Sequence, residues 1–375
     1  MMKNNPPPIR SHIQNLLKDP ATMARWETLI LGAAQRTEWL ERLVHTPPGF
    51  GLFATFSNVA RGSRKLEVKL RRHGVELGTI RLNPQNTPKF RLKKPGESSP
   101  LNAVFDSIRK ANPADDWPQL VRGCDWRSDA LGRFLARIRE RQLPDSIKEQ
   151  MLEDALVQSF ARNKTDGKFW FDHCALAEPQ VAGQVFPFKF ALPIIVEQEK
   201  TEAIKSGQWD KLINPTEDYG APDILVRCKM ILSATGWRLG VVELKKERPN
   251  HAAVALLQGF AYAVAIAELQ RIYSNNQPVR AALRTLLGFT KPRPATIPLA
   301  VYALVEERDV LAVKEKNPLT AAVLSECGEI LVGILGYKLC KDTNEIKLTS
   351  AAQWTGGIWN SIEPDAPRKS VNLVA

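Results

Sequence analysis

Cysteine is scarce in this chain of 375 residues, and its pattern excludes two classes of small, cross-linked fold. The five cysteines are odd in number, widely spaced and without a CxxC pair; they are Cys124, Cys174, Cys228, Cys327 and Cys340. A disulfide framework needs paired, regularly spaced cysteines, and a structural zinc site needs close pairs of thiolates or imidazoles. Neither is predicted, so we expect a protein of the reducing cytoplasm.

Long apolar segments are also lacking. The longest run, Ala252 to Ala267, is 16 residues and is interrupted by Gln258 and Tyr262, which is shorter than the roughly 18 to 20 residues that a bilayer span needs. The N-terminal MMKNNPPPIRSHIQ has no apolar core of a signal peptide. We therefore predict no association with a membrane. No GxxxxGK[ST] loop occurs, so no built-in ATPase is indicated.

Positive charge is abundant and concentrated. Lys and Arg total 52 against 40 Asp and Glu, a net charge of +12, which favours an acidic partner such as nucleic acid. Between Arg61 and Lys94 there are eleven basic residues and two acids, a local excess of nine. Alternation along a strand would place Lys65, Glu67, Lys69 and Arg71 on one face of a β-sheet, which makes a basic surface suited to phosphate contacts.

The candidate nucleic-acid-binding residues in this region are Arg61, Arg64, Lys65, Lys69, Arg71 and Arg72. An alternative is that the same charges form a solvated face that protects an edge strand from aggregation. The sequence alone leaves both interpretations open.

The length of the chain and changes in its texture predict two domains. We expect a basic, β-rich domain over residues 1–100, a linker and helical connector over 101–143, an α/β domain over 144–350, and a tail over 351–375. The second domain reads as helix, strands, long helix and strand, which is typical of an α/β fold with a central mixed sheet flanked by helices.

Charged residues interrupt two apolar strands of that second domain. Asp223 follows Pro222 and heads the run Ile224 to Val226, and Glu243 and Lys245 lie in the run that begins at Gly240. Because strand side chains alternate, Glu243 and Lys245 project to one side. An acid and a base inside apolar strands indicate a task for them, since burying charge is costly.

Two helices flank these strands. The helix from about His251 to Arg271 carries Gln258 and Tyr262 four residues apart, and so on one face. An amphipathic helix over residues 145–163 carries Glu149 and Glu153 at the edge of its apolar face, where solvated charge is the ordinary alternative.

Pro222-Asp223, Glu243-Leu244-Lys245 and the pair Gln258 and Tyr262 together resemble the PD-(D/E)xK nuclease superfamily, in the QxxxY-containing branch that includes RecB-like and defence-associated enzymes. The resemblance covers about residues 145–306. It implies a restriction-endonuclease-like α/β core, a Mg²⁺ cofactor that Mn²⁺ replaces, and a metal-binding glutamate on the preceding helix, either Glu153 or Glu149.

The chemistry of the residues agrees with that resemblance. Asp223 and Glu243 offer the oxygen ligands that Mg²⁺ prefers, and Lys245 is placed to orient or help deprotonate an attacking water. The resemblance adds Glu153 or Glu149 to these ligands. Gln258 and Tyr262 would contact the phosphate or fix the geometry of the site. We expect a metal-dependent nuclease acting on DNA, with restriction or antiphage defence as a context that the resemblance suggests.

Two alternatives stand beside this expectation. The chain could be a catalytically inactive nucleic-acid-binding or scaffold protein on the same fold, or its basic module could restrain the nuclease until a ligand or partner releases it. Cleavage of double-stranded DNA would favour a homo-oligomer, a dimer or a tetramer, because each such site acts on one strand.

Overall fold

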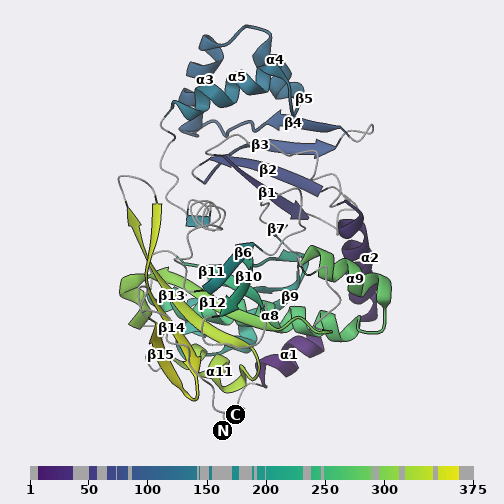
Figure 1. Ribbon diagram of the computed structural model, residues 1–375, viewed down its shortest axis with the longest axis vertical. Helices are drawn as coiled ribbons and strands as arrows, with labels where there is room; N and C mark the ends of the chain where they lie inside the picture. The colour runs from purple at the N-terminus through teal and green to yellow at the C-terminus, as the bar shows by residue number, and fades with distance from the viewer. Residues whose placement is uncertain are drawn as a thin grey trace.

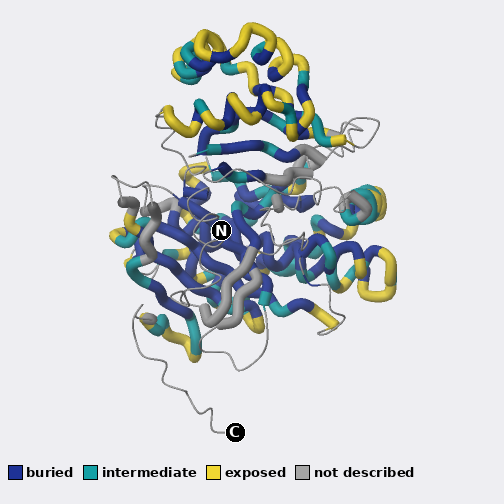
Figure 2. The backbone as a smooth tube through the Cα atoms, turned by 45° about the horizontal axis from the view of Figure 1, so that its top comes forward, coloured by how far each residue is buried: buried dark blue, intermediate teal, exposed yellow. Residues whose placement is uncertain are grey.

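The computed structural model describes residues 7–36, 50–56, 66–72, 74–82, 87–141, 143, 152–153, 171–176, 188–189, 192–198, 200–230, 238–245, 249–287, 289, 295–311, 317–340 and 345–362. Two β-sheets dominate this part of the chain, one above the other in Figure 1. Figure 2 shows that buried backbone runs through both sheets and through the long helix beside the lower one. The mixed α/β class and the mixed sheet expected from the sequence are confirmed.

The upper sheet has six strands. In spatial order they are β5 (Cys124–Asp125), β4 (Pro88–Leu92), β3 (Val75–Leu82), β2 (Leu66–Arg72), β1 (Gly51–Phe56) and β7 (Phe188–Lys189). All neighbours are antiparallel except β1 and β7, which are parallel. A short strand from the second half of the sequence thus completes a sheet that begins in the first half.

One face of this upper sheet is covered by helices α3 (Leu101–Ala111), α4 (Asp116–Arg122) and α5 (Asp129–Arg139). Phe90 of β4 lies 6.4 Å from Phe134 of α5 between ring centroids, and Phe105 of α3 lies 5.9 Å from Phe134. These rings bury the apolar side of the sheet. The sequence suggested a connector over residues 101–143. The helices of residues 101–139 instead form a helical layer that packs on the upper sheet.

The lower sheet has seven strands. In spatial order they are β15 (Ile358–Ile362), β14 (Glu345–Thr355), β13 (Leu331–Cys340), β12 (Leu299–Glu306), β11 (Arg238–Leu244), β10 (Ile224–Met230) and β6 (Phe171–Leu176). The central strands β11, β12 and β13 are parallel, and the outer pairs are antiparallel. Residues 351–362, expected as part of a tail, form the end of β14 and all of β15.

Helix α8 (Pro249–Ile272) connects β11 towards β12 and packs against both strands. Its segment Ala252–Ile272 is long and apolar enough to cross a membrane, but 94% of the most apolar window is buried inside the protein. That burial is typical of the core helix of a soluble protein. The apolar composition of α8 is explained by contact with protein on all sides.

Smaller elements surround α8. They are a hairpin of β8 (Leu192–Val196) and β9 (Ile213–Gly220) that encloses α7 (Thr201–Ser206) and η2 (Trp209–Lys211), the helices α9 (Gln277–Leu286) and α11 (Pro318–Glu326), and the turn η3 (Glu307–Asp309). Strand β8 and helix α11 both lie against α8.

The first two helices of the chain, α1 (Ile9–Leu16) and α2 (Pro20–Arg36), pack on the lower unit, where Figure 1 draws them in purple. The backbone amide of Ile9 donates to Glu326 Oε1 of α11 at 2.7 Å, and Tyr273 donates its hydroxyl proton to the carbonyl of Met23 at 2.8 Å. The beginning of the chain therefore belongs to the unit that contains α8, α9 and α11.

Candidate active site

Asp223 and Glu243 meet where β10 begins beside the end of β11. Ile224 pairs with Val242 in the antiparallel ladder, which brings the residues before and after this pair together. The amide of Leu244 donates to Asp223 Oδ2 at 2.9 Å, and the amide of Asp223 donates to Glu243 Oε1 at 3.3 Å. Each carboxylate is thus held by the backbone of the opposite strand.

Glu243 is the most deeply buried charged side chain of this group, with 0% of its surface exposed. Burial is the main cause that raises its pKa well above the usual value, the charge of Asp223 adds to the rise, and the charge of Lys245 opposes it. Glu243 Oε2 is buried and has no hydrogen-bond partner among the described residues. A buried, unsatisfied carboxylate oxygen is costly, and such cost is typical of functional sites.

Lys245 directly follows β11, and only 3% of its surface is exposed. Its amide donates to the carbonyl of Leu304 at 3.0 Å, so the pairing with β12 continues past the end of the strand. The hydroxyl of Tyr337 donates to the carbonyl of Lys245 at 3.5 Å. Alternation therefore keeps Glu243 and Lys245 on one side, as the sequence predicted.

Helix α8 brings Gln258 and Tyr262 to the two acids. Gln258 Nε2 donates to the Tyr262 hydroxyl at 3.4 Å, and both side chains are buried. Burial raises the pKa of Tyr262, and the charges of Glu243 and then of Asp223 add to the rise. The phenol therefore lies beside the carboxylates and stays protonated at neutral pH.

The close approach of α8 to the sheet depends on Gly259. A Cβ atom at this position would lie 2.8 Å from Val301 Cγ1 of β12 and 3.4 Å from Glu243 Cγ. The first distance is shorter than side-chain packing tolerates, and Val301 is itself fully buried. The absence of a side chain at residue 259 thus sets the spacing between Glu243 and the helix.

A further residue of the site, Gln198, was missed by the sequence analysis. Gln198 Nε2 donates to Gln258 Oε1 at 2.9 Å, and the backbone of Val196 hydrogen-bonds to Tyr262. The end of β8 thus fixes the orientation of both helix residues. A glutamine shortly after an apolar strand is a common pattern, so the sequence held no specific signal for this contact.

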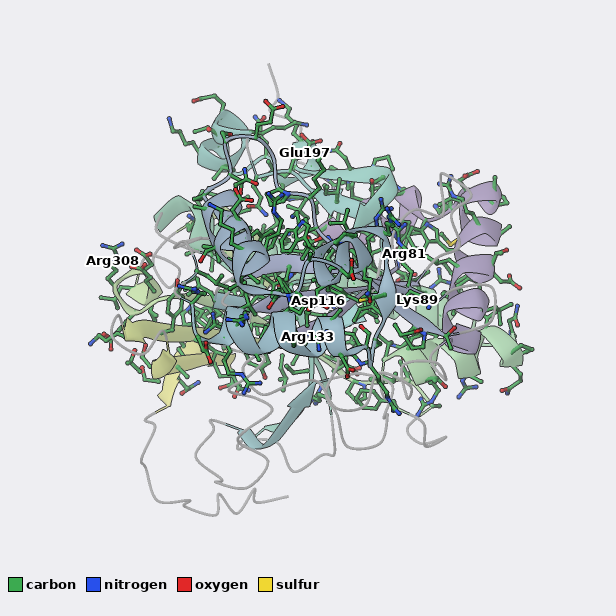
Figure 3. The ribbon with its side chains drawn as sticks, turned by 90° about the horizontal axis from the view of Figure 1, so that it is seen from above. Arg81, Lys89, Asp116, Arg133, Glu197 and Arg308 are labelled. Carbon is green, nitrogen blue, oxygen red and sulfur yellow. The ribbon has the colours of Figure 1, made fainter. Side chains whose placement is uncertain are left out.

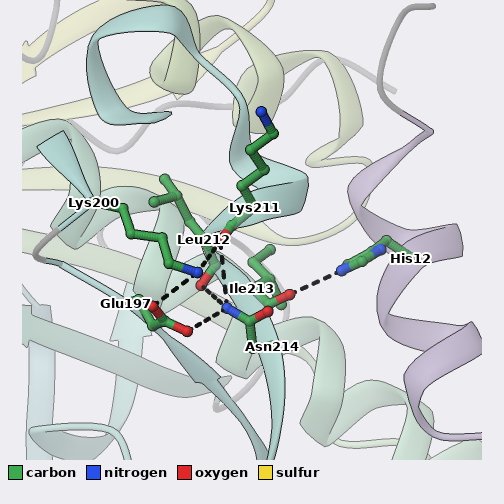
Figure 4. Close-up of polar contacts among 7 residues, drawn as sticks. All are labelled: His12, Glu197, Lys200, Lys211, Leu212, Ile213 and Asn214. Atoms are coloured by element: carbon green, nitrogen blue, oxygen red, sulfur yellow. Dashed lines mark hydrogen bonds and ion pairs between the residues drawn. The ribbon is translucent and has the colours of Figure 1, made fainter. Parts of the chain in front are cut away.

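The hairpin that carries Gln198 is itself tied down by polar contacts, which Figure 4 shows. Asn214 donates from Nδ2 to Glu197 Oε1 at 2.7 Å, and Lys200 Nζ lies 2.9 Å from Glu197 Oε2. On the other side, His12 Nε2 lies 3.0 Å from the carbonyl of Ile213, which links helix α1 to β9. Gln198 therefore extends from a braced turn.

Glu153, the expected helix acid, makes an ion pair with the upper sheet. Its Oε2 lies 2.9 Å from Arg71 Nη1, and the two side chains are 3% and 4% exposed. In the part of the chain that the structure describes, no three Asp, Glu, His or Cys side chains form a group that could hold a metal ion. Glu153 is thus bound by Arg71, while Glu149 lies outside the described residues.

The basic residues that the sequence suggested for nucleic-acid binding differ in their surroundings. Arg61, Arg64 and Lys65 lie outside the described residues. Lys69 is partly exposed and lies 3.4 Å from Glu76. Arg72 faces the helical layer, where it donates to the carbonyls of Ile138, Arg139 and Arg141 at 2.8 to 2.9 Å and so caps the end of α5.

Arg71 and Arg72 therefore serve internal contacts, not the solvent-facing phosphate contacts that alternation suggested. A register shift follows Leu70, and the segment containing Glu153 buries Arg71.

Comparison with protein-family models, with curated proteins and with solved structures found no significant match.

Proposed function

We propose that this chain is a metal-dependent nuclease that hydrolyses phosphodiester bonds of double-stranded DNA on a restriction-endonuclease-like fold. The observation that carries the proposal is the crosswise-bonded carboxylate pair Asp223 and Glu243. Glu243 is fully buried in a mixed sheet, Asp223 is half-buried, and Lys245 directly follows β11. Structural cores do not need two acids at one point, whereas phosphoryl transfer does.

The residues present fit a divalent cation such as Mg²⁺. Glu243 Oε2 is buried and has no partner among the residues that the structure describes, and the donor set of the pair is purely oxygen, which is the preference of Mg²⁺. Asp223 and Glu243 would hold the ion. When bound, such an ion supplies charge neutralisation at the phosphoryl group and a more acidic water.

The side chains around the pair have separate tasks in this proposal. The Lys245 ammonium orients the attacking water and offsets the negative charge that develops on the phosphoryl oxygens. The protonated phenol of Tyr262, oriented by Gln258 and by the backbone of Val196, donates a hydrogen bond towards the acids or the phosphate. Hydrolysis adds water to phosphorus and breaks one P–O bond, and the leaving oxygen takes up a proton.

A second candidate function is a catalytically inactive nucleic-acid-binding protein on the same fold. One observation favours it: Glu153 Oε2 is engaged by Arg71, and among the described residues no three acids form a group that could hold a metal ion. A site with two carboxylates keeps more water around an ion and holds it less tightly. The two candidates differ in turnover, not in binding.

The test is cleavage of plasmid and linear double-stranded DNA, with single-stranded DNA and RNA in parallel, in the presence of Mg²⁺ or Mn²⁺. We expect cleavage by the wild type and a loss of at least about a hundredfold in Asp223→Ala, Glu243→Ala and Lys245→Ala. Nuclease activity that is unchanged in all three variants would exclude this site. Binding without turnover under every condition would favour the inactive protein.

A context of restriction or antiphage defence and a homodimer or tetramer are further parts of the proposal. Simultaneous cleavage of both strands needs two sites, since each site acts on one strand. Light scattering of the purified protein at working concentration checks this part. A monomer that makes double-strand breaks at a first-order rate in enzyme would contradict it.

A further inference from the structure

The upper sheet presents a set of cations that overlaps the candidates chosen from the sequence only at Lys69. On β3 and β4 the apolar residues Ile80 and Phe90 point to the helical layer, where Phe90 contacts Phe134 of α5. The intervening residues Arg81 and Lys89 therefore project from the opposite face, and Arg91 alternates with them, although its Nε donates to the carbonyl of Val121 in α4 at 3.3 Å.

The strand register gathers these cations into neighbouring positions. Arg81 pairs with Lys89 across β3 and β4, and Thr79 pairs with Lys69 on one side and with Arg91 on the other. Neighbouring strands are about 4.8 Å apart, so the charges form two adjacent rows across three strands. Figure 3 shows Arg81 and Lys89 together, apart from Asp116 and Arg133 of the helical layer.

The acids on this face only partly neutralise it. Lys69 and Lys93 share Glu76 at 3.4 and 3.5 Å, and Lys89 lies 2.8 Å from Asp125. These pairs are at least partly exposed, and such pairs contribute little and exchange readily for another anion. Glu67 shares this face with Lys69 by alternation along β2, so five cations face three acids and two positive charges remain in excess.

The composition of this face favours a nucleic-acid backbone over a membrane or an apolar protein surface. Among the described residues, the large hydrophobic side chains that are exposed are Val121, Leu311 and Ile358, and none belongs to β2, β3 or β4. A membrane-surface element adds apolar side chains that insert between lipids. Spaced cations with a threonine hydroxyl suit phosphates, which carry most of the affinity of non-specific binding.

The face is mounted on the framework of the candidate active site. Strand β1 of the upper sheet pairs with β7, and β7 lies against β10, the strand that Asp223 precedes. The next residue along β2 from Leu70 is Arg71, whose partner is Glu153. A polymer bound on this face is thus held by the element that adjoins the site strand.

We propose that the face formed by Lys69, Arg81, Lys89, Arg91 and Lys93 is a sequence-independent binding surface for the phosphate backbone of a DNA duplex. The proposal rests on the proposed function, because it supplies the substrate-holding surface of the same nuclease. Of the candidates chosen from the sequence it keeps Lys69 and leaves out Arg71 and Arg72, which serve internal contacts.

The test is anisotropy of a fluorescein-labelled DNA duplex of mixed sequence, titrated with the full chain in EDTA across a series of KCl concentrations. The face variant is Arg81→Gln/Lys89→Gln/Arg91→Gln. The matched control is Arg109→Gln/Lys110→Gln/Arg139→Gln, which removes the same charge from exposed positions of the helical layer. We expect the face variant to bind at least about tenfold more weakly, with a salt slope smaller by about 2 to 3, and the control to resemble the wild type.

Equal losses in the two triple variants, an unchanged face variant, or no binding by the wild type would each overturn the proposal. Tighter binding of poly-glutamate or of anionic vesicles through the same three cations would overturn it as well, in favour of those partners. Melting curves check folding. If the triple variant unfolds, the single exposed change Arg81→Gln replaces it, with an expected fall of about 1 in the slope.

Hydrolysis of bis(p-nitrophenyl) phosphate separates this proposal from the proposed function. A small diester needs the carboxylate pair but not the sheet face, so the face variant should hydrolyse it as the wild type does, and Asp223→Ala should not. Loss of duplex binding with intact diesterase activity supports both proposals. Reduced duplex binding without any diesterase activity would leave the face supported and the nuclease rejected.

Discussion

The guanidinium of Arg71 and the carboxylate of Glu153 form a buried ion pair, 2.9 Å apart, between residues 82 positions apart in the sequence. Arg71 belongs to β2 of the upper sheet, and Glu153 belongs to the segment that leads to the lower unit. Two residues assigned to separate tasks, phosphate binding and metal binding, thus neutralise one another. The pair ties β2 of the upper sheet to residue 153.

Breaking this pair on one side should be costly. Arg71→Met leaves Glu153 buried without its guanidinium, and we expect a loss of about 3 to 5 kcal/mol in the free energy of unfolding. Urea denaturation measures it. The double variant Arg71→Met/Glu153→Leu should recover most of the loss, because neither charge of this ion pair then remains. Lys93→Met, which removes an exposed partner of Glu76, is the control and should change stability by less than about 1 kcal/mol.

A double variant that is as unstable as Arg71→Met would contradict this account. It would mean that the pair is retained for shape, not for charge compensation.

Glu243→Gln should separate stability from activity. Burial and Asp223 raise the pKa of Glu243 in the folded state, so the folded protein binds its proton more tightly than the unfolded chain does. The stability of the wild type relative to the glutamine variant should therefore fall as pH rises from the unfolded pKa through the folded one. At neutral pH in EDTA we expect the glutamine variant to be more stable than the wild type, because each tenfold difference in proton affinity between the folded and unfolded wild type contributes about 1.4 kcal/mol. We also expect the variant to be inactive.

Thermal melts at pH 4 and pH 7.5 check this sign. A variant that is less stable than the wild type at both pH values would show that Glu243 is ionised and well compensated without a metal ion.

Gly259→Ala should destabilise the protein although alanine favours helices. The added Cβ meets Val301 Cγ1 at 2.8 Å, and overpacking of this kind costs about 1 to 3 kcal/mol, more than the roughly 1 kcal/mol gained in helix propensity. Gly132→Ala in α5 is the matched control, because a Cβ there meets nothing within 4 Å. We expect the control to be neutral or stabilising by chemical denaturation. Equal effects at both positions would remove Gly259 from the description of the site.

Gln198→Ala should lower kcat without a comparable change in KM. Gln198 touches Gln258 and not the acids, so its loss frees the Gln258 amide to rotate, and misplacement of this kind costs about tenfold or more. Asn214→Ala, which removes a contact to Glu197 in the same hairpin, is the control and should leave kcat near that of the wild type. A rise in KM alone, or equal losses in both variants, would place Gln198 among the hairpin's structural residues.

Alternation along a strand and spacing along a helix depend only on residues close together in the sequence, so these patterns predicted the strands of the candidate site. Alternation in β11 places Glu243 and Lys245 on one side, and the four-residue spacing in α8 places Gln258 next to Tyr262. The partners that complete these groups come from distant segments. Neither the Gln198 contact, 60 residues away, nor the Arg71 pair follows from periodicity within one strand or helix.

The upper sheet shows the same limit. A contiguous run of basic residues was chosen there, whereas the exposed cations are spread over three paired strands whose register the sequence does not contain. The strand register shifts after Leu70, and Lys69 is partly exposed whereas Arg71 is buried.

The path of the chain between the two sheets has a consequence for how the protein comes apart. The chain leaves the lower unit after α2, builds β1 to α5 in the upper layer, returns at β6, visits the upper sheet again at β7 and comes back at β8. A single backbone cut between the layers therefore leaves them joined by the remaining strands of chain. Removing residues before β1 would take α1 and α2 away from α8, α9 and α11, and would damage the unit that contains Asp223 and Glu243.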